Sequence, residues 1–480
     1  MEFELTATSE AVTALGRLKA LTSSRDGRPR SQSVKIVWHD SPEHALAVDG
    51  LILSEQRGLW RLERMMPGSG TWLPAQPPPI VTESPDHATL PAPLAPLAAF
   101  EGRRTSSVHR FGDTSVTLTL KKGILRTVAA ERPVGRILLD GDEAAVRSAA
   151  LLIADAIPVA VPLSSLAADG IALATGRPAA PRHRGAPVLP DGMAGVPDAL
   201  AHIIGHLTDV ILANAAHANE PGKTGVEAVH QMRVAVRRAR SALSVFRPAV
   251  ETSALATITT GLRALGHQLG PSRDWDVFVD ETVPAIREAL PGDKRLERLA
   301  SAAGRRRKEH RTALTGYLGS NAFRTLAIEL AWFAAAASWH VTSDTEPASL
   351  PAFSAAVLRN RWKKLVAQGK RMDELDIPGL HGVRLRAKRA RYAAEMFITL
   401  YPEKASHRFI RRLSLLQQSL GVLNDGSVAT HLLEELGGPS GRHAYATGVI
   451  VGFLAARTGK MRPRIVQAFE KFRRQDTYWA

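Results

Sequence analysis

Cysteine is absent from this chain of 480 residues, and that absence removes several kinds of chemistry at once. A protein without thiols has no disulfide, no thiolate nucleophile, no iron–sulfur cluster and no cysteine-based zinc site. Long apolar runs are missing as well, since none reaches the roughly 18 residues of a membrane-spanning helix. The first ten residues, MEFELTATSE, are acidic and do not resemble a secretory signal. We therefore expect a protein of the cytoplasm with no membrane partner.

Acidic residues are scarce only in the second part of the chain. The whole sequence has 62 Lys and Arg against 46 Asp and Glu, a formal net charge of +16. Residues 1–197 hold 21 basic and 20 acidic residues, so residues 198–480 carry a net charge of +15. A field of this size attracts polyanions such as nucleic acid, anionic membrane or phosphate polymers, and net charge alone does not choose among them.

The amino-acid composition and the hydrophobic pattern change at the point where the net charge changes. Residues 1–176 are rich in Pro, Gly, Ser and Thr and contain short alternating or β-branched runs, which are typical of strands. Residues 177–197 hold five prolines and little periodicity, which predicts a linker. From residue 198 onward the pattern is helical nearly throughout. The sequence therefore predicts an α+β protein with an N-terminal domain over 1–176 and an all-α domain over 198–480.

A repeat divides the helical domain. Residues 229–243 read VHQMRVAVRRARSAL, and residues 380–394 read LHGVRLRAKRARYAA. An offset of 151 residues aligns these segments, and the same offset aligns a second motif about 40 residues further on. One offset shared by two motifs indicates a duplication, with halves of about 198–345 and 346–480 forming helical bundles about a pseudo-twofold axis. The second motif consists of Leu269, Gly270 and Asp274 in the first half and Leu420, Gly421 and Asp425 in the second.

The basic residues of each repeated segment fall on one face of a helix. Offsets of 0, 3, 7 and 10 span about 80° of arc along roughly 15 Å of helix. The resulting stripes are His230, Arg233, Arg237 and Arg240, and His381, Arg384, Lys388 and Arg391, with Arg238 and Arg389 beside them.

The cations of each stripe repel one another when no anion is bound, because like charges three or four residues apart on a helix destabilise it by a few tenths of a kcal/mol per pair. Guanidinium groups bind phosphate in a fork with charge assistance, so two facing stripes would line a groove or pore for an extended polyanion. The alternatives are a solvated basic face, or arginines paired with Asp274 and Asp425 as structural bridges. The histidine found at the same place twice favours a binding site, since a salt-bridge scaffold does not need it.

The repeated motifs resemble the CHAD family, the conserved histidine α-helical domain. The resemblance covers about 198–480 and both halves, through HQMRVAVRRARSAL with LGPSRDWDV and HGVRLRAKRARYAAE with LGVLND. It implies two four-helix bundles that bind inorganic polyphosphate along a central basic surface. It also implies that the Asp residues end helices or orient Arg. The implied polyphosphate ligands are His230, Arg233, Arg237, Arg238, Arg240, His381, Arg384, Lys388, Arg389 and Arg391.

The first part of the chain is similar to the CYTH domain, the triphosphate tunnel fold that often precedes CHAD. Glu2-Phe3-Glu4 resembles the start of its ExExK signature, WHDSP at 38–42 resembles its YFDTP segment, and SSLAADG at 164–170 lies where the family has SKxxRG. The resemblance implies an antiparallel β tunnel or barrel that holds a triphosphate with cations and a divalent metal with carboxylates.

The departures from that family concern the cations. Five expected cation positions are neutral or acidic, a sixth falls near Arg64 and is undecided, and Glu2 and Glu4 remain. We therefore predict a CYTH-like domain that has lost catalysis, with no catalytic residue, no bound metal and no cofactor. The five substituted positions are Thr6, Ser54, Gln56, Ser165 and Asp169.

Two other functions stay open. A nucleic-acid binder is favoured by the +15 charge and the Arg-rich helices, although the motifs carry few aromatics for stacking on bases. An active triphosphatase or polyphosphatase is favoured only by the presence of a CYTH-like and a CHAD-like domain in the same chain. His202 and His206 have the spacing of two zinc ligands but no third ligand, so we expect surface or capping roles. The preferred prediction is a cytoplasmic polyphosphate-binding protein that associates with polyphosphate granules; oligomeric state and chain-length preference are not predicted.

Overall fold

The structure is a computed structural model, and it describes residues 1–64, 80–82, 90, 93–176, 186–193, 195–250, 253–336, 349–459 and 461–479. The chain divides into two compact units. Unit 1 consists of Met1–His183, Thr208–Ala213 and Gly319–Trp339; unit 2 consists of Arg184–Leu207, Asn214–Leu318 and His340–Ala480.

An eight-stranded antiparallel sheet forms the framework of unit 1. Its strand order is β1-β8-β7-β6-β2-β3-β4-β5, so β1 and β5 are the two edges. This confirms the predicted α+β class with an antiparallel N-terminal domain. The strands are β1 (Glu2–Ala7), β2 (Arg25–Asp40), β3 (Leu51–Gln56), β4 (Leu59–Arg64), β5 (Ile80–Thr82), β6 (Ala95–Phe111), β7 (Thr114–Arg126) and β8 (Glu131–Gly141).

The sheet is curled, as is indicated by interactions between charged groups on strands that are far apart in the strand order. Lys121 of β7 lowers the pKa of both Glu4 on β1 and Glu63 on β4, although burial is the larger influence and raises the pKa of each carboxyl. The paired residues Gly102 and Gly123 allow the close approach of β6 and β7, since a Cβ on either would lie 2.3 Å from a carbonyl oxygen of the other strand.

Short helices cover the sheet. They are α1 (Ser9–Leu15), α2 (Lys19–Ser24), α3 (Ala45–Val48), α4 (Glu143–Ala156) and α5 (Leu166–Thr175). Helix α4 begins at its N-cap Asp142, whose carboxylate accepts hydrogen bonds from the N–H groups of Ala144 and Ala145.

Helix α11 (Asn321–Ala335) belongs to unit 1, although it comes from the middle of the helical sequence. It packs against α4, where Arg147 forms a two-point ion pair with Glu329, at 3.0 Å from Nε and 2.7 Å from Nη2. The Glu329 side chain is only 3% exposed. The sequence has an apolar and aromatic run at 331–339, AWFAAAASW, and residues 331–334 of this run are buried in the helix. The last residues of the run, 337–339, lie outside the described ones.

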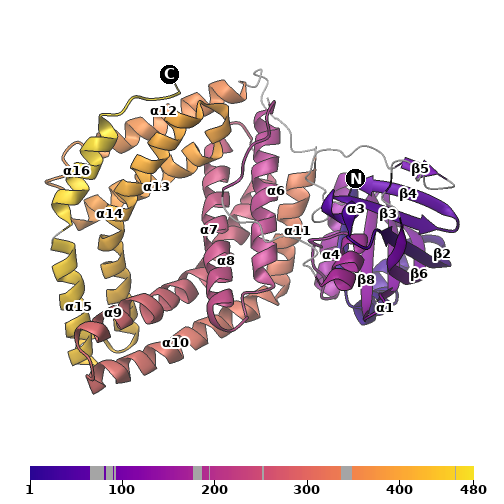
Figure 1. Ribbon diagram of the computed structural model, residues 1–480, viewed down its shortest axis with the longest axis horizontal. Helices are drawn as coiled ribbons and strands as arrows, with labels where there is room; N and C mark the ends of the chain where they lie inside the picture. The colour runs from indigo at the N-terminus through magenta and orange to yellow at the C-terminus, as the bar shows by residue number, and fades with distance from the viewer. Residues whose placement is uncertain are drawn as a thin grey trace. The chain divides into compact units, whose positions relative to one another are not determined.

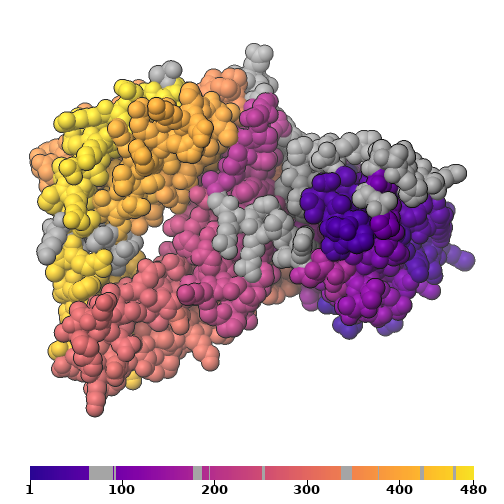
Figure 2. Space-filling view, in the orientation of Figure 1, coloured from indigo at the N-terminus to yellow at the C-terminus, as the bar shows by residue number. Residues whose placement is uncertain are grey.

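Long helices build unit 2 (Figure 1). Figure 2 shows an opening through this unit, bordered by the surfaces of the α7–α8, α10 and α13–α15 segments. The helices of the first half are α6 (Val196–Ala215), α7 (Gly222–Phe246), α8 (Ser253–Val277), the π-helical turn η1 (Phe278–Thr282), α9 (Val283–Ala289) and α10 (Lys294–Leu318). Those of the second half are α12 (Leu350–Gln368), α13 (Ile377–Met396), η2 (Ile398–Leu400), α14 (Glu403–Glu435), η3 (Gly438–Ser440), α15 (Ala444–Gly459) and α16 (Arg462–Arg473).

The two sequence halves share a hydrophobic core. One buried cluster joins Trp275, Phe278 and Leu299 of the first half to Leu432 and Ile450 of the second. Helix α7 also packs against α13, its counterpart in the repeat. The halves are therefore interlocked, and the two copies of the basic motif lie on neighbouring helices.

Helix α6 is long and apolar enough by composition to cross a membrane, which the sequence analysis overlooked. In the structure 72% of its apolar window is buried inside the protein, as in the core helix of a globular domain.

Candidate functional site

Helix α7 presents basic side chains on one face because its other face is buried. Small apolar residues recur at helical spacing along the buried face and pack into the core of unit 2. Helix α13 has the same division. Its N-terminus is capped by Asp376, which accepts from the N–H of Gly379. The buried residues include Ala228, Met232, Ala235 and Ala239 on α7, and Leu380, Val383, Ala387 and Ala390 on α13.

The two basic motifs meet where α7 contacts α13. Lys388 of α13 lies within electrostatic range of Arg233 and Arg237 on α7 as well as Arg384 and Arg391 on its own helix. Burial, reinforced by these four cations, lowers the pKa of Lys388 to about 7. We refer to these five residues as the α7–α13 cation cluster.

Arg233 is held in place by Asp274 of α8, with 3.1 Å between its Nη2 and Oδ1 of the carboxylate. An ion pair at this place was expected both from the resemblance, as an aspartate that orients an arginine, and from the alternative of a structural bridge. Burial raises the pKa of Asp274, and Arg233 is the cation that most opposes this rise. Gly270 makes room for the arginine, since a Cβ there would lie 3.2 Å from Nη1 of Arg233. The side chain of Asp425, its counterpart in the second half, lies outside the described residues.

Glu395 links the two helices and was missed by the sequence analysis. Its carboxylate lies 3.0 Å from Nη2 of Arg238 on α7 and 3.5 Å from Nε of Arg391 on α13. Its side chain is 14% exposed. The residue stands four positions after Arg391, a spacing that permits an ion pair on one helix, but its contact with α7 has no sequence signal.

The two repeated histidines have different surroundings. His230 is half-buried, and burial lowers its pKa, followed in effect by Arg273. His381 is exposed. Arg273 therefore adds a cation beside the first histidine, at the place where the second half has Asn424.

The outer members of the predicted set are less enclosed. Arg240 is exposed, and its guanidinium lies above Gly266 of α8. Arg389 is exposed and faces Arg361 of α12, whose pKa is lowered by burial and then by Arg389. Arg361 belongs to a basic segment at residues 359–364, RNRWKK, so α12 extends the basic surface beyond α13.

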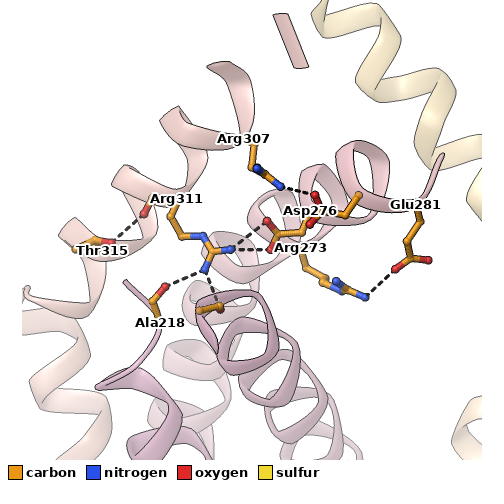
Figure 3. A network of polar contacts seen from close by, with 9 residues as sticks. Ala218, Arg273, Asp276, Glu281, Arg307, Arg311 and Thr315 are labelled. Carbon is orange, nitrogen blue, oxygen red and sulfur yellow. Dashed lines mark hydrogen bonds and ion pairs between the residues drawn. The ribbon is translucent and has the colours of Figure 1, made fainter. Parts of the chain in front are cut away.

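Arg311 fixes the elements that carry the first motif (Figure 3). Its Nη2 donates to both oxygens of Asp276 on α8, at 3.0 and 2.9 Å, and its Nη1 donates to the carbonyl oxygens of Ala218 and Gly225 at 2.8 and 2.9 Å. Asp276 is fully buried. Since Arg311 ties the start of α7 to the end of α8, it positions the cluster without belonging to it.

The basic run RRRK at 305–308 lies on α10, and two of its arginines form ion pairs. Arg306 pairs with Glu309 at 2.8 Å and Arg307 pairs with Asp280 at 2.7 Å (Figure 3 shows the second pair). These two arginines are neutralised locally by their ion pairs. They do not extend the cation cluster.

The positions that the sequence comparison aligned with CYTH cations make local contacts in the structure. Thr6 donates to the carbonyl of Gly135, and Ser54 donates to that of Arg61. Ser165 is the N-cap of α5 and accepts from Ala168 N–H. The side chain of Arg64 lies outside the described residues.

Asp169 is not left as an isolated anion inside unit 1. It accepts from Nη2 of the buried Arg136 at 2.6 Å and lies 3.6 Å from Arg132. Arg136 also lies 3.9 Å from Glu4. The sequence alignment missed these two cations because both come from β8, away from the motifs that it compared.

The remaining histidine pair is not a metal centre. His202 shares a hydrogen bond of 2.9 Å with the carbonyl of Val188. Within the described part of the chain, no group of three or more His, Asp or Glu side chains could hold a metal ion.

Comparisons with known proteins identify the helical region. The family model for the CHAD domain matches residues 204–434, so this region is a CHAD domain. The crystal structure of the CHAD domain from the plant Ricinus communis is 28% identical, with a TM-score of 0.54, over 62% of this chain and 98% of that one. PptA from Streptomyces chartreusis is 20% identical, with a TM-score of 0.45, over 57% of this chain and 99% of that one, which is too weak to support an inference. No curated protein matches the chain.

Proposed function

We propose that the protein binds inorganic polyphosphate at the α7–α13 cation cluster. The observation that carries this proposal is the environment of Lys388, whose charged neighbours are all arginines from the two repeated motifs. Such a cluster is unfavourable in isolation, because each cation raises the cost of the next. A polyanion laid along α7 and α13 removes this repulsion for both stripes at once.

The choice of a phosphate polymer over a nucleic acid rests on the side chains of the cluster. Guanidinium and ammonium groups recognise phosphate oxygens, whereas single-stranded nucleic acid binding also uses aromatic platforms for the bases. The aromatic residue beside the cluster, Tyr392, is only 5% exposed. The opening in Figure 2 offers a path for a thin, extended chain.

The CYTH-like reading of unit 1 is part of the same proposal. The sheet curls, and Glu4 lies near Lys121 and Arg136, which is compatible with a remnant of a triphosphate tunnel. Because Arg136 is committed to Asp169, we propose that unit 1 does not catalyse phosphate hydrolysis.

A competition experiment tests the proposal. The full-length protein is used because Gly319–Trp339 packs within unit 1. Labelled long-chain polyphosphate is bound and then displaced by unlabelled polyphosphate, single-stranded DNA or duplex DNA at matched phosphate concentration, in several salt concentrations. We expect polyphosphate to compete at least tenfold better than either DNA, and binding to weaken as salt rises through loss of the counterion-release contribution. Equal competition by DNA would contradict phosphate-polymer specificity and leave a general polyanion binder.

A further inference from the structure

A second basic surface lies on α10, away from α7 and α13. Lys294, Arg298, Ser301 and Arg305 follow one another by four, three and four residues, so they share one face along about 16 Å of helix. They line a cavity of about 600 Å³ together with Glu297, Arg442 and His443.

Three arginines of this cavity are not paired with an acid among the described residues. In the described parts of the chain, Arg298, Arg305 and Arg442 form no ion pair with a carboxylate. Glu297 is the acidic residue of the lining, and it lies 4.0 Å from Arg287. The cavity therefore has an excess of positive charge, and the residues that line it are all polar or charged.

His443 is the point on which the guanidinium groups converge. Burial lowers its pKa, and Arg442, Arg305 and Arg298 lower it further, in that order. Its Nε2 is buried and has no hydrogen-bond partner among the described residues. The residue immediately precedes α15, whose first N–H groups add positive potential at the same place.

The wall of the cavity is held in shape by contacts outside the lining. The guanidinium of Arg295 stacks on the ring of Tyr445, 3.3 Å from its centroid, and so joins the start of α10 to the start of α15. Asp293 accepts from the Arg295 side chain, and this hydrogen bond holds the pKa of Asp293 at about 2. The first half of α10 and the start of α15, beside which the cations lie, are thus joined to each other before any ligand binds.

We propose that this cavity, lined by Arg298, Arg305, Arg442 and His443, is a second anion site that takes a short inorganic phosphate chain. The cavity extends far enough along α10 to hold several linked phosphoryl groups rather than a single phosphate ion. Its lining has no apolar side chain to receive an acidic peptide. A neutral imidazole can donate to a phosphate oxygen from one nitrogen while accepting from a water or a protonated phosphate at the other. The site does not require polyphosphate at the α7–α13 cluster.

Titration calorimetry with tripolyphosphate separates the two sites in the full-length protein. The first variant, R237Q/K388Q, removes charge from the α7–α13 cluster. The second, R298Q/R305Q/R442Q, removes the cavity cations. The control, R306Q/R307Q, removes two paired and partly exposed arginines from the same helix.

We expect R237Q/K388Q to retain one tripolyphosphate site per chain. We expect the cavity substitutions, made in that background, to weaken this site by roughly tenfold or more, because several charged hydrogen bonds are lost. The control substitutions in the same background should leave it unchanged. Complete loss of binding in R237Q/K388Q, or equal affinity in the cavity and control variants, would overturn the inference.

Equal binding of polyglutamate would show a site for any polyanion and would overturn the assignment to phosphate. Loss of long-chain binding in R237Q/K388Q with retained tripolyphosphate binding would support both sites separately.

Discussion

Lys388 is the residue whose protonation most depends on its neighbours. In an unfolded chain a lysine titrates near its ordinary pKa of 10.5, whereas burial and four nearby arginines bring Lys388 to about 7. The free protein therefore holds a lysine that is only partly charged at neutral pH. An arginine at the same place would remain charged, because its pKa lies far above this range. The identity of residue 388, where the first motif has Arg237, thus makes the second stripe sensitive to pH.

Polyphosphate affinity should fall as pH rises above about 7. A bound polyanion raises the pKa of Lys388 above its free value, so binding takes up a proton, and linkage makes the affinity fall by up to about tenfold per pH unit between the two values. His230, whose pKa is lowered by burial and by Arg273, contributes in the same direction at lower pH. The measurement is a titration with long-chain polyphosphate from pH 6 to 8.5.

The controls assign this dependence to particular groups. Lys388→Arg keeps the charge at all pH values and should flatten the profile above pH 7. His230→Gln with His381→Gln should alter only the lower part, where protonation of the polymer itself partly offsets the histidines. A Lys388→Arg protein with the wild-type profile above pH 7 would refute the role given to the lysine.

At the scale of elements, the sequence was most informative where a pattern repeats. The 151-residue offset identified α7 and α13 as equivalents, and the structure places these helices in contact. The periodicity could also indicate which face of each helix is basic. It could not indicate that Glu395 bridges to Arg238, or that Arg311 ties α7 to α8, because those contacts depend on how separate helices pack. For the same reason the assignment of α11 to unit 1 could not be predicted from helical periodicity.

Replacing Arg233 and Arg384 by Gln should weaken polyphosphate binding far more than replacing Arg306 and Arg307. The first pair is half-buried and stands on the two repeated motifs, where a phosphate fork is partly shielded from water and each lost contact costs about 1.5–3 kcal/mol. The second pair is neutralised by Glu309 and Asp280 on a more exposed face, where a charge contributes little. Equal losses in parallel titrations would mean that net charge alone governs binding.

The α4–α11 contact makes a prediction about stability. Arg147→Ala leaves the buried carboxylate of Glu329 without its partner and should destabilise unit 1 by about 3 kcal/mol, since an unpaired buried charge is strongly unfavourable. Arg147→Met with Glu329→Leu removes both charges and should restore most of that loss. The check is the thermal unfolding of both variants. A double variant no more stable than the single one would show that packing around Arg147, including its 5.0 Å contact with Trp332, matters more than the charge.

At the scale of the whole molecule, the two units differ in how charge is arranged. In unit 1 the buried Arg136 is matched by Asp169 and Glu4, so the interior of the curled sheet is nearly balanced. In unit 2 the cation cluster and the α10 cavity both hold more basic than acidic side chains, although Asp274 pairs with Arg233, Glu395 pairs with Arg391, and Glu297 lines the cavity. The +15 excess of residues 198–480 is thus partly concentrated at these two places.

The full-length protein should show no measurable hydrolysis of ATP, thiamine triphosphate or tripolyphosphate with magnesium or manganese. Phosphoryl transfer depends on fixed positive charge around the phosphates. In unit 1 the motif positions Thr6, Ser54 and Ser165 supply hydroxyl groups instead, and these bond to nearby backbone. Phosphate release is the measurement. Metal-dependent turnover that disappears in Glu2→Gln with Glu4→Gln would show that Lys121 and its neighbours suffice as a clamp.

Helix α11 has a consequence for how the chain responds to cutting. After α5 the polypeptide contributes only Thr208–Ala213 of α6 to unit 1 while it builds α6 to α10, and it then returns to contribute α11 before it continues into α12. A protease that cleaves between residues 176 and 195 would therefore not liberate the N-terminal fragment. The two pieces would stay associated through α4 and α11, elute together from a sizing column, and separate only in denaturant.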